Sequence, residues 1–139
     1  MIFTDTITIY NHYKDSSGVD HWKKTILEGV MYKRKIEHGI LASGAPTDGR
    51  FTVNEYISIT IPNRSGYYSP VEWKKNHTGW TLNPKSGLDI VLLGNCEKEL
   101  NYTYRLKDLK RDMGDIGVIK AVHDNTKRDY LKHWRVIAV

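Results

Sequence analysis

A regular alternation of apolar and polar residues runs from Phe51 to Ile61 and is the strongest pattern in the chain. Apolar side chains occupy every second position of this segment, with Glu55 as the one exception on the apolar face. Successive side chains of a β-strand point to opposite faces, so a period of two gives a half-buried strand with one apolar and one polar face. We therefore predict a central strand over residues 51–61.

Weaker copies of the same alternation surround this segment. They predict further strands over residues 4–13, 21–32, 88–93, 117–123 and 130–139. Short polar residues and a glycine at 14–18 predict a turn that joins the first two strands into a hairpin. The alternation of the second strand slips near Gly29, where a β-bulge would restore its phase.

Two short helices are expected between the strands. Residues 69–72 read Ser-Pro-Val-Glu, a capping box with proline at the first helical position. This predicts a helix from Pro70 to about Lys75, which Trp73 would hold to the body. Apolar residues at i, i+3 and i+7 in the segment 105–113 predict a second, amphipathic helix, ended by the glycine that follows it.

Long connections at 33–50 and 62–87 interrupt the strands. The first has no sustained period and is either a loop or a hairpin extension that reaches beyond the body. The second contains the first helix, and Trp80 and Leu82 suggest the start of another strand. Adjacent hairpins favour a mainly β fold, a small antiparallel β-barrel or sandwich with long loops and one or two short helices. At 139 residues we expect one domain, 1–139.

The composition argues against several classes of function. Cys96 is the only cysteine, which excludes an intramolecular disulfide and suits a reducing cytoplasm, and the six histidines show no HxxxH or HExxH spacing. No segment approaches the roughly 18 apolar residues of a membrane helix, and the start lacks the basic region of a signal peptide. Nucleophile and phosphate-loop motifs are absent. We expect no enzyme activity, no cofactor, no metal and no membrane contact.

Charge and aromatic content leave two kinds of partner open. The net charge of +5 allows contact with nucleic acid or an acidic protein surface, or simply a solvated basic surface. Nine tyrosines and four tryptophans stand against two phenylalanines, and three of them, Tyr67, Tyr68 and Trp73, lie together on the second connection. These three are candidates for a protein interface, for stacking on single-stranded nucleic acid, or for packing at the rim and core of the barrel.

Short motifs over most of the chain carry a family resemblance. They are Asp5–Asn11, Leu27–Val30, Ile57–Pro62, Trp80–Leu82, Asp89–Val91, Leu106–Leu109, Val118–Val122 and His133–Val136. Together they resemble an uncharacterised family of small proteins from tailed phages and prophages of Gram-positive bacteria. The chain departs from that pattern at Gly87-Leu88-Asp89, where many relatives read Gly-Asp, and 33–50 aligns poorly.

The resemblance implies a place in the head-to-tail morphogenesis module of a phage. There, small β-barrel proteins act as head-closure, or stopper, proteins, whose copies form a ring, here a hexamer or dodecamer, with a long loop in the DNA channel. The loop residues would be Lys33, Arg34, Lys35, His38 and Arg50. Partners would be further copies of the chain, the neighbouring adaptor, portal and tail-terminator proteins, and packaged double-stranded DNA.

This role places the protein in the virion, and in the host cytoplasm during assembly. Two alternatives stay open at this point. One is a tail terminator or another structural protein of the neck or tail. The other, from a different class, is an OB-like protein that binds single-stranded nucleic acid, which would carry aromatic and basic residues on one exposed strand face.

Overall fold

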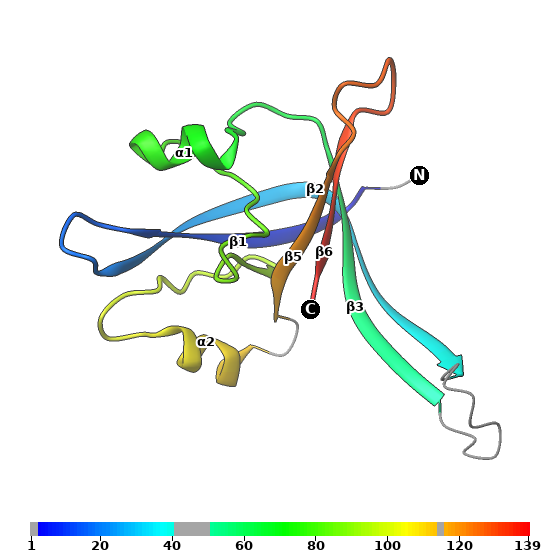
Figure 1. Cartoon of the computed structure of the whole chain (residues 1–139), viewed down its shortest axis with the longest axis horizontal. Helices are drawn as coiled ribbons and strands as arrows, with labels where there is room; N and C mark the ends of the chain where they lie inside the picture. Colours follow the sequence, from blue (N-terminus) through cyan, green and yellow to red (C-terminus); the bar gives the residue numbers. More distant parts are fainter. Residues whose placement is uncertain (1–2, 41–50, 114–115) are drawn as a thin grey trace.

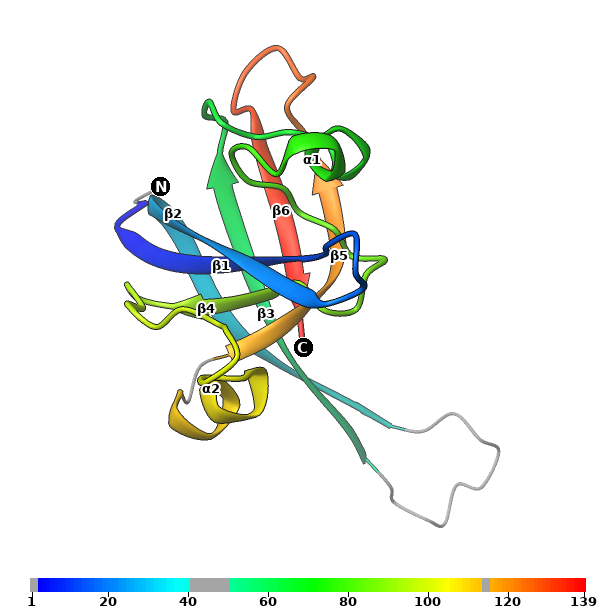
Figure 2. The same cartoon turned by 90° about the vertical axis from the view of Figure 1, so that its left-hand side faces the viewer.

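The described residues form a closed antiparallel β-barrel with two short helices (Figures 1 and 2). The computed structural model describes residues 3–40, 51–113 and 116–139, and the side chains of these residues except 37–40 and 51–54. The elements in chain order are β1 Asp5–Lys14, β2 Asp20–Ile40, β3 Phe51–Pro62, α1 Pro70–Asn76, β4 Ile90–Leu93, α2 Leu106–Asp112, β5 Ile116–Asp124 and β6 His133–Ala138. Around the barrel the strands run β1-β2-β3-β6-β5-β4. The prediction of a mainly β fold is confirmed, and the barrel is the form it takes.

The long strand β2 turns a corner between two parts of the barrel. Residues 20–30 pair with β1 and residues 31–40 pair with β3. Gly29 is the extra residue between the partners of Asp5 and Thr6, with a φ of 72°. Glycine reaches this conformation without strain, and a bulge adds bend and twist to a strand. The bulge predicted at Gly29 is therefore confirmed, and it lets one strand serve both parts of the barrel.

The far halves of β2 and β3 form a two-stranded arm outside the barrel (Figures 1 and 2). β3 pairs with β6 only from Ile57 onward, whereas β2 and β3 stay paired as far as Ile40 and Phe51. We call residues 35–40 and 51–56 the arm. We expected residues 33–50 to form either a loop or a hairpin extension. Residues 33–40 form the hairpin extension, and residues 41–50 lie outside the described part.

The arm also explains the exception in the alternation of β3. Glu55 stands on the same face of the strand as Ile57, but it lies beyond the point where β6 closes the barrel. Its carboxylate accepts a hydrogen bond of 3.0 Å from the guanidinium of Arg34. A charged residue is tolerated on this face because the face is exposed there.

The barrel interior is filled by apolar side chains from all six strands and by two tryptophans. Every second residue of β3 from Ile57 to Ile61 is at most 1% exposed. The rings of Trp80 and Trp134 pack edge to face, with centroids 5.3 Å apart, a favourable arrangement for aromatic side chains. Trp80 belongs to the connection 62–87, so this connection contributes to the barrel core as well as covering it.

A second core lies on the outer face of β1 and β4. Tyr10 and Leu92 are buried there under Leu109 of α2 and the segment that leads to it. The Tyr10 hydroxyl donates to the carbonyl oxygen of Lys98 at 2.6 Å, and burial raises its pKa. The alternation of β1 predicted which residues share each face of the strand. It did not predict that the face carrying Tyr10 is covered by α2 and the segment before it.

The connection 62–87 is held by α1 and by hydrogen bonds to its own backbone. The Ser69 side chain accepts from the backbone N–H of Glu72, and Trp73 is 1% exposed, so the predicted cap and anchor are both confirmed. Near Trp80 the structure shows an isolated bridge to Tyr67 in place of the expected strand. The backbone turns at Gly79, which has a φ of 73°, and a turn at this point prevents continuous strand pairing before Trp80.

The carboxylate of Asp15 accepts hydrogen bonds from residues of the turn between β1 and β2, and its pKa can be measured by titration. Hydrogen bonds from the Ser17 hydroxyl and from His21 hold the pKa of Asp15 below its ordinary value. Its contribution to stability is therefore complete above the ordinary carboxyl pKa and is lost as the pH falls through the lowered one. We expect NMR titration to give a midpoint below about 3.9, and Ser17→Ala to raise it. An ordinary midpoint in the unchanged protein would contradict this description of the turn.

Candidate functional site

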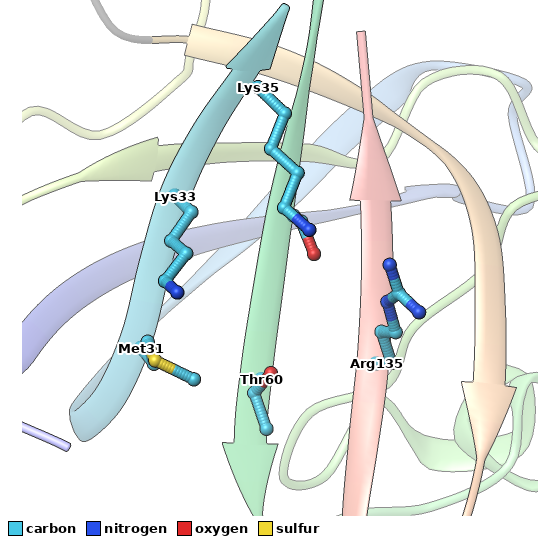
Figure 3. A pocket seen from close by; sticks show the side chains of 6 residues that line it. Met31, Lys33, Lys35, Thr60 and Arg135 are labelled. Carbon is cyan, nitrogen blue, oxygen red and sulfur yellow. The ribbon is translucent and has the colours of Figure 1, made fainter. Parts of the chain in front are cut away.

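Polar side chains line a shallow hollow on the outer face of β2, β3 and β6. It has a volume of about 230 Å³ and is lined by Met31, Lys33, Lys35, Ser58, Thr60 and Arg135. Figure 3 shows the two lysines on β2 and Arg135 on β6 on either side of β3, from which Thr60 projects. We call this the basic hollow.

Strand register explains why these residues meet. Thr60 pairs with Met31 on one side and with Arg135 on the other, and Lys33 pairs with Ser58. Directly opposed residues of antiparallel strands have Cβ atoms about 4.5–5.5 Å apart and share a face. The alternation that buries Ile57 and its neighbours therefore turns this polar set outward.

The cations of the basic hollow are not neutralised within the described part of the chain. There, no carboxylate lies within ion-pair distance of the amino groups of Lys33 and Lys35 or of the guanidinium of Arg135. Arg34 differs, because it points to the opposite face and pairs with Glu55. Three like charges around two hydroxyl groups make a site suited to an anion.

The predicted basic residues thus divide into separate places. Lys33 and Lys35 line the basic hollow, whereas Arg34 does not. His38 is on the arm, where its backbone pairs with Val53, and Arg50 lies outside the described residues. Arg135 was not among the candidates. It stands between the buried Trp134 and Val136, so the alternation of this strand could have placed it on the outer face.

Comparison with known proteins gives a family and no function. The sequence model of one family, "Family of unknown function (DUF6751)", matches residues 2–139. The chain belongs to this family. No curated protein and no solved structure matches the sequence of this chain.

In this DUF6751 protein the three aromatic candidates occupy different environments. Trp73 is the buried residue of α1, and its indole N–H donates to the carbonyl oxygen of Gly79 at 3.2 Å. Tyr67 is half-buried against Trp80 and Trp134, and burial raises its pKa. Only Tyr68, which is 38% exposed, has its ring at the surface. Tyr68 is thus the one of the three that can contact a partner directly.

A buried polar cluster around Asp89 joins β1 to the connection 62–87. One carboxylate oxygen accepts from Asn11 Nδ2 at 2.9 Å and from the backbone N–H of Asn83 at 3.3 Å. The other accepts from the backbone N–H of His12 at 3.0 Å and from the Ser86 hydroxyl at 3.1 Å. Burial raises the pKa of Asp89 although these four donors oppose the rise. With every acceptor position of the carboxylate in use, the cluster fits a structural role.

The remaining polar and metal-ligating groups of the described residues do not form a metal site. The described residues contain no group of three or more His, Cys, Asp or Glu that could hold a metal ion. Cys96 is buried, and its backbone N–H donates to the Thr8 hydroxyl. None of the helices in the described part is long and apolar enough to cross a membrane.

Proposed function

We propose that this protein is a ring-forming structural protein of the phage neck, the head-closure component of the connector between head and tail. The observation that carries the proposal is the arm, a paired extension of β2 and β3 that leaves a closed barrel. The sequence motifs that resemble small phage proteins agree with it. A barrel of this kind has no free edge strand, so it can serve as a compact block in an assembly.

The dimensions of the arm suit a channel-lining element. Six residues of a strand extend about 20 Å at ~3.3 Å per residue. In a ring, every copy would present one arm toward the axis, with Lys33 and Lys35 on one face at its base. Glu55 offsets the charge of Arg34, so the positive charge that repetition around the ring would bring near DNA phosphates comes from these two lysines.

A ring of identical subunits also needs two different contact surfaces, one on each side of the subunit. Exposed apolar side chains occur at several separated places on this protein: Val19, Tyr68, Val71, Tyr102, Tyr130 and Leu131. Tyr68 and Val71 lie at α1, whereas Tyr130 and Leu131 lie on the β5–β6 connection. Separate patches of this kind are compatible with head-to-tail contacts between copies.

Removal of the outer part of the arm tests the proposal directly. Ile36 and Glu55 are paired neighbours, so residues 37–54 can be replaced by an Asn-Gly turn that closes the shortened hairpin. We expect the barrel to unfold at nearly the same temperature, because the arm lies outside it. Phages that carry this version should assemble heads and fail to retain their DNA.

The position of the protein in the virion separates this proposal from its rivals. Cryo-electron microscopy of the neck should show a ring between the adaptor and the tail tube, with the arms directed at the axis. Density on the tail side of the joint would favour a tail terminator instead. Absence from particles, or full DNA retention without the arm, would contradict the neck role.

A further inference from the structure

We propose that the basic hollow binds a phosphate group of a DNA backbone. The anion chemistry rests on the hollow itself, and the choice of DNA as the source of the phosphate rests on the proposed function. The site lies beside the arm, over the strands that close the barrel, and shares only Lys35 with it. Its ligands would be Lys33 and Lys35 from β2, Arg135 from β6, and the hydroxyl groups between them.

The first argument is the concentration of positive charge. The three cations lie on either side of β3 and repel one another, and a carboxylate on β3 between them would offset this cost. Here the residues of β3 between Lys33 and Arg135 are Ser58 and Thr60, which carry hydroxyl groups and no charge. An anion would relieve the repulsion and accept charge-assisted hydrogen bonds.

The second argument is the fit of a phosphate to this space. β2 and β6 are separated by β3, so their backbones are roughly 9.6 Å apart at the usual strand spacing of ~4.8 Å. Long side chains from both edges can converge on one group above β3, and Arg135 offers a planar fork for two phosphate oxygens. The hydroxyls of Ser58 and Thr60 supply donors from below.

The third argument favours a polymer over a free anion. The hollow is a shallow depression that stays open to solvent, so a chain can pass over it. Lys33 and Lys35 are two residues apart, about 6.6 Å along the strand, so a polymer can place a second phosphate beside the one bound in the hollow. Lys35 also lies where the arm begins, so the hollow adjoins the element that the proposed function places beside DNA.

The test compares two triple variants in a DNA-binding measurement. Lys33→Gln, Lys35→Gln and Arg135→Gln together remove the charge of the hollow. The control Lys74→Gln, Lys75→Gln and Lys110→Gln removes the same charge from exposed positions on α1 and α2. Binding of a fluorescent DNA duplex is followed by anisotropy over a range of salt concentrations, and thermal unfolding confirms that both variants fold.

We expect the hollow variant to lose about tenfold or more in affinity at low salt, and its slope of log K against log salt to fall by about 2–3. The control should change the slope by less than about 1. Equal losses in both variants would mean that net charge alone attracts DNA, and would overturn the site. Tighter binding of a single strand than of the duplex would overturn the choice of duplex and support the single-strand binder.

NMR titration with inorganic phosphate separates the two sources of phosphate. Shifts at Ser58 and Thr60 that saturate with free phosphate, without any binding of the duplex, would overturn DNA as the source. The test of the DNA-binding site and the test of the neck role can fail separately. Unchanged DNA binding by the hollow variant refutes this site even if the protein forms the neck ring, whereas absence from virions refutes the neck role even if the hollow binds DNA.

Discussion

Gly79→Ala is expected to lower the free energy of unfolding by about 2–5 kcal/mol, the sum of backbone strain and overpacking. Gly79 has a φ of 73°, a region in which a side chain is strained. A Cβ atom there would collide with the carbonyl oxygen of Gly66 and would lie 2.9 Å from the Tyr68 ring. That carbonyl accepts from the backbone N–H of Trp80, so relief of the collision would displace a tryptophan of the barrel core.

Gly87 supplies the matched control for this prediction. It lies on the same connection with a φ of 68°, but a Cβ atom there would meet no heavy atom within 4 Å. Gly87→Ala should therefore show only the backbone strain, about 1–2 kcal/mol. Urea unfolding of both variants measures the difference. Equal losses would mean that the close approach of the backbones at Gly79 is not needed to hold the connection.

Asp89→Asn should destabilise the protein by about 2–4 kcal/mol at neutral pH, because an amide cannot accept at both positions. Each carboxylate oxygen of Asp89 accepts from two donors. The amide nitrogen of asparagine would face two of these donors and leave them without an acceptor in a buried place. Asp129→Asn, at an exposed position on the β5–β6 connection, is the control and should cost little.

The pH dependence of this difference follows from the raised pKa of Asp89. In the folded state the group holds its proton to a higher pH than in the unfolded chain. Its contribution to stability is thus complete below the ordinary carboxyl pKa and decreases as the pH rises through the raised one. Asparagine has no such dependence, so the gap between the two proteins should narrow with rising pH. A gap that widens would show that the four hydrogen bonds outweigh burial.

Alternation was enough to predict most of the strands and failed where packing came from elsewhere in the chain. β3 and the bulge in β2 follow from their own residues. The face of β1 that carries Tyr10 looked polar, because the α2 segment that covers it is about 90 residues further along. The strand expected near Trp80 did not form, because Gly79 turns the chain there and Trp80 packs into the barrel.

The basic hollow could be predicted only in part for the same reason. Lys33 and Lys35 were visible as neighbours in the sequence, and the alternation of β2 separates them from Arg34. Arg135 joins them only because β6 pairs with β3. That pairing brings together residues about 100 positions apart, and no local pattern contains it. The site is therefore a property of the strand order more than of any motif.

The strands β2 and β3 continue from the barrel wall into the arm, and this continuity fixes the direction of the arm. The pairing of these strands runs from Met31 and Thr60 to Ile40 and Phe51 without a change of register. No glycine or proline interrupts residues 30–38 or 51–61, so the joint has no hinge. The direction of the arm is then set by the orientation of the whole subunit, because both strands continue unbroken from the barrel into the arm.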